Sequence, residues 1–332
     1  MGTIHIWVET DKIARDLFVT RQRKYCDRNV LPAAVKVKYG SELLPLMGYG
    51  DAFRRYKNFM HLIMKQSKPK QFYGYPVLEN KKTLRRLIES PEQWSEHMIV
   101  HCEYIAETHI WDNHADSKIG ARTIAAVAWG DAAHGTKLLT MVPYLLKTVS
   151  PAGPIINKLT FLQNLPESIS PFKQEENKQF ARVRDAFYEA LQDVKDRIAA
   201  GTAEDSWSKL WLDGENKEKA NISLNWHEAA HAIGSSSFVA IATIGGPLHC
   251  FFTAMCHYPS WQTRVQEEID RVCGDRLPTV DDMPQLPMLR ATVKEILRWR
   301  QPTPLGVPHV ALEDDVYDGY FIPKDAIVHA NH

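Results

Sequence analysis

The 332-residue sequence has few cysteines, and none of them lies in a metal-binding or disulfide-rich pattern. The five cysteines are an odd number and include no C-x-x-C pair, which argues against a disulfide framework and favours reduced thiols inside a cell. No stretch of about 18 apolar residues occurs, and the N-terminal segment does not resemble a signal peptide, so the sequence predicts no membrane anchor. The formal net charge is zero, so no overall field favours nucleic acid as a partner.

The composition that remains is ordinary for a soluble globular protein, with 44% hydrophobic and 24% charged residues. The basic charge is nevertheless uneven along the chain. Residues 54–86 contain ten Lys or Arg and a single acidic residue, Glu79. Such a run is either a solvated helix face or a docking surface for an acidic partner, and the sequence leaves both open.

The segment 287–300 is predicted to form an amphipathic helix. Its apolar residues Leu289, Val293, Ile296 and Leu297 recur at helical spacing, a proline lies at its start and another follows its end. Within this helix Glu295 and Arg298 are three residues apart, so their side chains share one face and can pair. By itself such a pair is a weak signal, because most are exposed surface contacts.

The context of this pair carries a family resemblance. From Tyr258 onward the order is an amphipathic helix, a proline-rich loop, the E-x-x-R helix, the segment G-V-P-H and the hairpin D-G-Y-F-I-P-K. This order resembles the second half of a cytochrome P450, a haem-thiolate monooxygenase, and a looser resemblance covers nearly all of the chain. It implies a mainly α fold with a small β region, forming one partial domain over residues 1–332. The haem-binding loop F-x-x-G-x-R-x-C-x-G occurs nowhere in these residues, and the N-terminal anchor typical of the family is missing too.

The resemblance implies a haem cofactor and oxygen insertion into a small apolar organic substrate. Because no axial cysteine is present, we expect this chain to be inactive by itself, with Glu295 and Arg298 in a structural role. An NADPH-dependent reductase is the expected partner on the basic face 54–86, and nucleic acid is not. The family is typically held at the endoplasmic reticulum membrane; without an anchor we expect this chain to be intracellular, and soluble or peripheral. Segments 29–45 and 143–171 are expected to shape access of the substrate.

The resemblance also assigns candidate site residues. Phe53 and Lys57 occupy the places of the family pattern W-x-x-x-R, and with His309 they are the candidates for contacting the haem propionates; a plain surface helix is the alternative for the first two. Thr243 lies where the family has a proton-relay threonine, but Ala242 replaces the acid that precedes it. The alternative for Thr243 is a hydrogen bond to its own helix.

A competing motif lies at residues 227–231, which read H-E-A-A-H. Two histidines one helical turn apart can bind Zn²⁺ while the glutamate activates a water, so His227, Glu228 and His231 predict a zinc metallohydrolase as the alternative. Position 237, where an extended form of the motif has a third histidine, is Ser237. A non-catalytic remnant of the P450 fold is the remaining hypothesis.

Local signals place several elements. Residues 3–8 alternate as a strand, after which Asp11 is predicted to cap a helix. Residues 174–200 are predicted to form a long charged helix ended by Gly201. Pro247 is expected to interrupt the apolar helix that follows the H-E-A-A-H motif, because it lacks a backbone N–H.

Overall fold

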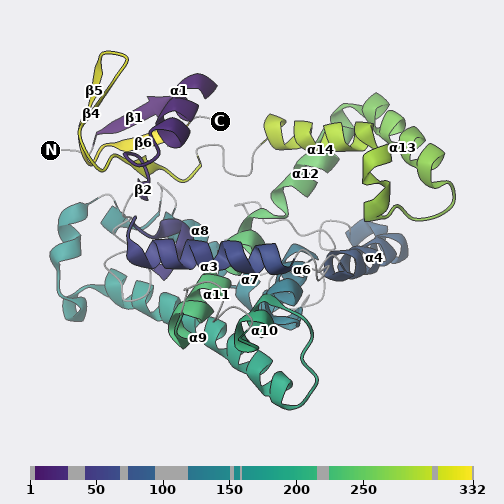
Figure 1. Cartoon of the computed structure of the whole chain (residues 1–332), viewed down its shortest axis with the longest axis horizontal. Coiled ribbons are helices and arrows are strands. Elements are labelled where there is room, and N and C mark those ends of the chain that lie inside the picture. The colour runs from purple at the N-terminus through teal and green to yellow at the C-terminus, as the bar shows by residue number, and fades with distance from the viewer. Residues whose placement is uncertain are drawn as a thin grey trace.

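The structure is a computed structural model and describes residues 4–28, 42–67, 74–93, 119–149, 153–157, 159–214, 224–300 and 306–330. It has three parts (Figure 1): a helical body, a small sheet unit that contains strands from both ends of the chain, and a lobe of three helices. The sequence-based prediction of a mainly α protein with a small β region is confirmed.

The helical body is built around one apolar helix. Helix α11 is capped by Asn225, whose side chain accepts from the N–H of Glu228 while the Glu228 carboxylate accepts from the N–H of Asn225. Its small residues let neighbouring helices approach closely: a Cβ at Gly234 would lie 2.3 Å from a ring carbon of Phe187. The helices of the body are α3 (Asp51–Ser67), α4 (Gly74–Glu89), α6 (Ile119–Trp129), α7 (Ala133–Leu139), α8 (Val142–Val149), α9 (Pro171–Ala199), α10 (Trp207–Leu212) and α11 (Trp226–Thr243).

Short turns of helix connect these elements. One of them, η3 (Leu44–Leu46), packs on α11, and the N–H of Leu44 donates to the hydroxyl of Ser235. The segment after α8 consists mainly of brief 3₁₀ turns, which agrees with the apolar, proline-punctuated loop expected there. The short turns are η4 (Pro91–Gln93), η7 (Ile155–Asn157), η8 (Thr160–Asn164) and η9 (Glu167–Ile169).

The small sheet unit joins sequences from opposite ends of the chain. Its larger sheet has the order β1-β6-β3-β2, with β1 and β6 parallel and the other neighbours antiparallel. The unit also contains α1 (Asp11–Arg15) and the π-helical turn η1 (Asp16–Thr20). The strands are β1 (His5–Val8), β2 (Asp27–Arg28), β3 (His309–Val310), β6 (Ile327–Ala330) and the separate hairpin of β4 (Asp315–Tyr317) and β5 (Tyr320–Ile322).

The lobe consists of α12 (Gly246–His257), α13 (Pro259–Cys273) and α14 (Pro287–Trp299), with the turn η10 (Val280–Gln285) between the last two. As predicted, the helix is interrupted between α11 and α12, where Pro247 has no N–H to continue the ladder.

One local prediction from the sequence needs correction. The strand at the N-terminus is confirmed as β1, but Asp11 is not the cap of the helix that follows. Thr10 is the N-cap, and its hydroxyl accepts from the N–H of Ile13 at 3.3 Å, while Asp11 lies in the first turn. A β-branched hydroxyl in extended backbone directly before the helix provides this bond without help from the carboxylate. Of the segment 29–45, which was predicted as a loop, residues 29–41 lie outside the part of the chain that the structure describes.

Among the residues that the structure describes, one helical run, Trp226–His257, is long and apolar enough to cross a membrane by length and composition. Its first half is α11, most of which is buried inside the body. The protein core therefore accounts for the apolar composition of α11. It does not account for that of α12, in which only Ala254 and Met255 are buried, and the qualifying 18-residue stretch of the run is 22% buried.

Candidate functional site

Two short strands bring a guanidinium and an imidazole to the same edge of the small sheet. Arg28 in β2 and His309 in β3 are directly opposed in an antiparallel pair, and both side chains are half-buried. Arg28 Nη1 donates to the carbonyl of Val307 at 2.8 Å. Burial lowers the pKa of Arg28, and the nearby charge of Asp27 opposes this effect, because desolvation disfavours the charged form.

The protonation of His309 is set by a backbone contact. Its Nδ1 lies 2.6 Å from the carbonyl oxygen of Tyr25, and a carbonyl can only accept, so Nδ1 carries the proton. Burial and the charge of Arg28 lower the pKa of His309 below its ordinary value. At neutral pH its Nε2 is therefore a bare lone pair, and a carboxylate beside it would favour protonation.

Helix α3 supplies a third cation near the sheet. Lys57 is exposed, and its Nζ lies 5.9 Å from the ring centre of the half-buried Phe53. The Lys57 charge acts on the thiol of Cys26, two residues from Arg28, although burial raises the pKa of that thiol overall. The N–H of Tyr49 donates to Asp27 Oδ1 at 2.6 Å and ties the start of α3 to β2.

We call Arg28, Lys57 and His309 the cationic cradle. Within the part of the chain that the structure describes, no carboxylate forms an ion pair with any of the three. Positive charge that is partly removed from water without a counter-ion favours an anion at that place. The sequence analysis identified Phe53, Lys57 and His309 but missed Arg28, because no local motif marks it and only the β2–β3 pairing brings it to His309.

Thr243 ends α11. Its hydroxyl donates to the carbonyl of Val239 at 3.1 Å, one helical turn back, which is the alternative that the sequence left open. The side chain is half-buried, and the preceding Ala242 packs against the core of the body. A role of Thr243 in proton transfer therefore requires its hydroxyl to exchange this internal bond for an external one.

Glu295 and Arg298 pair on α14 as predicted. Arg298 donates to both carboxylate oxygens, at 2.8 and 2.6 Å, so the contact is bidentate. Hydrogen bonding from Arg298 lowers the pKa of Glu295. Both side chains are exposed and line an open cavity of about 540 Å³, formed by residues of α12, α13 and α14.

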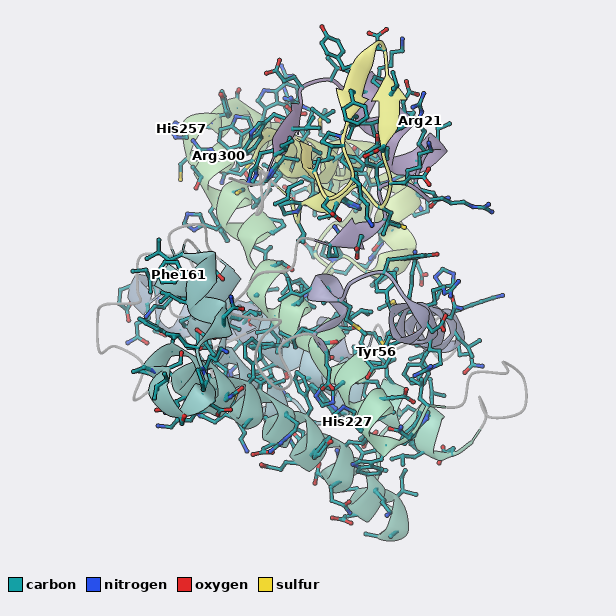
Figure 2. All side chains as sticks on the ribbon, turned by 90° about the vertical axis from the view of Figure 1, so that its left-hand side faces the viewer. Arg21, Tyr56, Phe161, His227, His257 and Arg300 are labelled. Atoms are coloured by element: carbon teal, nitrogen blue, oxygen red, sulfur yellow. The ribbon has the colours of Figure 1, made fainter. Side chains whose placement is uncertain are left out.

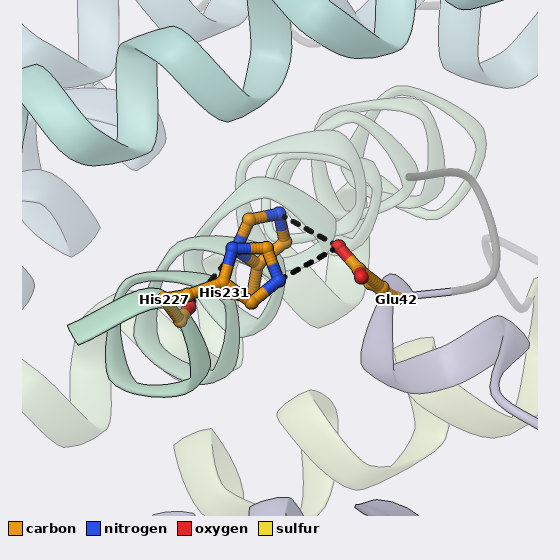
Figure 3. A group of neighbouring side chains, drawn as sticks. All are labelled: Glu42, His227 and His231. Carbon is orange, nitrogen blue, oxygen red and sulfur yellow. Dashed lines mark hydrogen bonds and ion pairs between the residues drawn. The ribbon is translucent and has the colours of Figure 1, made fainter. Parts of the chain in front are cut away.

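The H-E-A-A-H segment forms the first turn and a half of α11, but only its histidines point toward a common ligand. His227 and His231 face the carboxylate of Glu42, which comes from the segment before η3 (Figure 3). Glu228 instead receives the N–H of Asn225 and the guanidinium of Arg55. A glutamate engaged in this way is not placed to activate a water between the histidines. The carboxylate that faces the two histidines is that of Glu42, which no sequence motif marked.

The described cysteines carry no sign of a metal-ligating thiolate. Cys26, Cys250, Cys256 and Cys273 are all free thiols. The pKa of Cys26 is raised, chiefly by burial, whereas a thiolate ligand requires a low thiol pKa.

The family follows from comparison with known proteins. The family model described as Cytochrome P450 matches residues 133–332, more than half of the chain. The chain belongs to the cytochrome P450 family. A cytochrome P450 monooxygenase of Armillaria gallica is 27% identical over 325 residues, which is 98% of this chain and 59% of that protein. The monooxygenase claR of Ampulloclitocybe clavipes is 30% identical over 348 residues, covering 100% of this chain and 59% of that protein. The chain thus spans well under two thirds of these P450 relatives.

Solved P450 structures share the fold. A zebrafish cytochrome P450 described with progesterone superposes with a TM-score of 0.73 at 15% identity, over 100% of this chain and 74% of the other. A second zebrafish structure, described with abiraterone, gives a TM-score of 0.67 at 16% identity, over 98% and 70% of the two chains. The predicted P450 fold and family are confirmed.

The basic run at 54–86 is largely neutralised where the structure describes it. Arg54 pairs with Asp51, and Arg85 pairs with Glu89. Lys82 lies 2.8 Å from the buried Glu79. The positive face predicted from composition is therefore weaker than the count of lysines and arginines suggests.

Membership of the P450 family implies a haem. The residues present fit one edge of it: the cationic cradle offers two cations, Arg28 and Lys57, and a histidine, His309, that a neighbouring carboxylate would help to protonate. None of the three is paired with a carboxylate among the described residues, and haem propionates are carboxylates. The fit concerns the propionates alone.

Proposed function

We propose that this chain forms the propionate-binding and substrate-facing part of a P450 monooxygenase that acts on a small apolar organic molecule. The observation that carries the proposal is the cationic cradle of Arg28, Lys57 and His309. When bound, a haem with a cysteine ligand supplies the chemistry by which this family inserts oxygen into a C–H bond.

The residues of this chain have separate tasks in that proposal. Arg28, Lys57 and a protonated His309 neutralise the two carboxylates of the cofactor, with Phe53 as an apolar wall beside them. Thr243 is the candidate for moving a proton, by releasing its hydroxyl from the carbonyl of Val239. Glu295 and Arg298 brace neighbouring structure rather than take part in chemistry.

The substrate and the redox partner are inferred from the family. The zebrafish relatives are described with abiraterone and progesterone, which supports a small organic ligand for this chain as well. An NADPH-dependent reductase is proposed to dock on the face that carries residues 54–86. Because many of these charges already have partners, the candidates for contacting its acidic side chains are Lys65 and Lys81, which form no ion pair with a described carboxylate and are not part of the cradle.

Haemin titration tests the cradle. Binding is followed by quenching of tryptophan fluorescence, since the sequence contains nine tryptophans. We expect Arg28→Gln, Lys57→Gln and His309→Gln each to weaken haemin binding by about 5-fold, the effect of losing one hydrogen bond or ion pair. Lys65→Gln is the matched control, because it removes the same charge from the exposed face of α3 away from β2.

Haemin dimethyl ester makes the test specific, because its propionates carry no charge. The three variants and the unchanged chain should bind the ester equally. The cradle does not bind propionates if the three variants weaken binding of the ester as much as binding of haemin. The same conclusion follows if Lys65→Gln weakens haemin binding as much as Lys57→Gln does. Absence of any haemin binding by the folded chain would also refute the proposal.

A further inference from the structure

Three potential metal ligands converge at the N-terminal end of α11 (Figure 3). His227 Nε2 lies 3.1 Å from Glu42 Oε2, and His231 Nε2 lies 3.3 Å from the same oxygen. The side chain of His231 is buried, and those of Glu42 and His227 are half-buried. This group lies in the helical body at His227, whereas Arg28 and His309 of the cradle belong to the sheet unit that carries Arg21 (Figure 2). It has no part in the function proposed above.

The proton positions leave two lone pairs facing each other. His231 Nδ1 lies 3.0 Å from the backbone carbonyl of His227, which only accepts, so Nδ1 bears the proton and Nε2 does not. With the proton on Nδ1, the neutral ring of His231 presents only a lone pair at Nε2. A neutral Nε2 cannot donate to Glu42, and an acceptor beside an acceptor is unfavourable unless a cation lies between them.

The carboxylate of Glu42 also lacks a hydrogen-bond donor at this place. Its Oε2 is buried, and within the described ranges it has no hydrogen-bond partner of acceptable geometry. A buried carboxylate oxygen without a donor is costly, and native proteins satisfy such atoms with a donor, a water or a metal ion.

The histidine rings are held in place by contacts behind them. The Tyr188 hydroxyl bonds Nδ1 of His227, and the rings of Tyr188 and Phe187 lie edge-on to His231 at 6.0 and 5.8 Å. Metal-bound histidines usually donate from their second nitrogen, which aims the first nitrogen at the ion. His231 donates in this way to the carbonyl of His227, and His227 does so when the Tyr188 hydroxyl accepts from its Nδ1. The one cation noted near His231, Arg184, is itself paired with Asp185.

The spacing also fits one ion. Zn²⁺ holds nitrogen and carboxylate ligands at about 2.0–2.2 Å in a tetrahedron, whose ligand atoms are therefore about 3.3–3.5 Å apart. The 3.1 and 3.3 Å separations from Glu42 Oε2 to the two histidines are close to that edge. We propose that Glu42, His227 and His231 form a zinc site that joins the segment before η3 to α11.

This site differs from the hydrolase that the H-E-A-A-H motif suggests. Glu228 completes the capping box of α11 and pairs with Arg55, so the glutamate of the motif does not face the proposed ion. The zinc would act as a cross-link: Leu44, two residues after Glu42, already bonds Ser235 of α11, and the ion would add a second tie to the same helix.

Metal binding by the purified chain tests the site directly. Zinc alone is titrated in competition with a chromogenic chelator, and Co²⁺ is used as a spectroscopic substitute because tetrahedral Co²⁺ absorbs visible light strongly. We expect one tight site per chain and a zinc-dependent rise in the midpoint of thermal unfolding. Glu42→Gln and His227→Gln should each weaken zinc binding by at least about 10–100-fold, which is the range for loss of a mere supporting partner.

Two variants serve as matched controls. Glu228→Gln alters the same motif without removing a proposed ligand, and His134→Gln alters the other convergent group, Asp131, His134 and Asp193, in which Arg197 already pairs with Asp193. Both should bind zinc as the unchanged chain does, with folding checked by circular dichroism. The proposal would be overturned if Glu42→Gln bound zinc as tightly as the unchanged chain, or if Glu228→Gln lost as much zinc affinity as Glu42→Gln. Absence of tight zinc binding by the unchanged chain would overturn it too.

Discussion

The helical body and the lobe of α12, α13 and α14 use apolar side chains very differently. In the body, large rings such as Trp129, Phe187 and Phe238 are almost fully buried in one continuous core. In the lobe, the hydrophobic cluster among the described residues consists of Ala254, Met255 and Ile296, and Val265, Cys273 and Leu286 are buried as well. The amphipathic stripe of α14 is real, yet Val293 and Leu297 on it are 49% and 46% exposed.

The same contrast holds for charge. Glu79 in the body is buried and bonded by Arg122 and Lys82, whereas Glu295 in the lobe forms its pair with Arg298 in solvent. A glutamate–arginine contact of similar length thus stabilises one region and adds little to the other, because solvent screens the exposed pair. The core of the body is enclosed by its own helices, whereas one face of the lobe is open to solvent at Val293 and Leu297.

The largest expected effect comes from one substitution made in both regions. Leu191→Ala in α9 removes a fully buried side chain and should lower the free energy of unfolding by about 2–5 kcal/mol. Leu297→Ala in α14 removes a half-exposed one and should change it by less than about 0.5 kcal/mol. Urea unfolding followed by circular dichroism measures both. A similar cost at the two positions would show that the apolar face of α14 is covered in solution.

The second test compares the two glutamates. Glu79→Gln leaves Arg122 without its carboxylate in a largely buried place, so we expect a loss of about 2–3 kcal/mol in unfolding free energy. Glu295→Gln should leave stability unchanged within error, because its partner is exposed. The denaturant midpoints of the two variants decide between them, and a destabilised Glu295→Gln variant would contradict the picture of an open lobe.

The smallest expected effect concerns Asp315 in the sheet unit, which is paired with two cations. Burial acts to raise the pKa of Asp315, but hydrogen bonds from Arg21, Lys24 and Tyr25 outweigh it and lower the pKa to about 2. The folded pKa lies below that of an unfolded aspartate, about 3.9. The stabilisation is therefore complete above about pH 5 and is lost as the pH falls toward 2.

Asp315→Asn isolates this contribution. We expect the variant to be less stable than the unchanged chain by about 1–2 kcal/mol at pH 7, with the difference shrinking as the pH falls from 4 to 2. The measurement is the unfolding free energy of both proteins as a function of pH. A difference that stays constant down to pH 2 would mean that Asp315 is not held ionised by its three donors.

Much of the fold could be predicted from local signals. The strand at the N-terminus and the break at Pro247 follow from alternation and from the missing N–H of proline. The long helix was predicted at residues 174–200 and is observed at Pro171–Ala199, so only its ends differ. The paired β1 and β6 could not be predicted in the same way, because their residues lie at opposite ends of the chain and no local rule joins them. The cap of the first helix was wrongly predicted because two adjacent residues, Thr10 and Asp11, can both fill that role.

The candidate site residues can be separated in the same way, into those found from the sequence and those found only in the structure. The residue types of Lys57, His309, Glu295 and Arg298 could be found by family resemblance, and their assigned roles stay predictions. Arg28 and Glu42 could not be found, since each becomes relevant only through a partner far away in sequence. Glu228 illustrates the converse: the motif marked it as a catalytic base, and the structure uses it as a helix cap.

The sequence by itself determined the family, the helical segments and the chemistry available, because periodicity, turn residues and motif spacing are properties of neighbouring residues. Only the tertiary structure decided which charged groups lack a counter-ion and which carboxylate faces His227 and His231. Those outcomes depend on burial and on contacts between distant segments, which change the energy of a charge far more than its neighbours in sequence do.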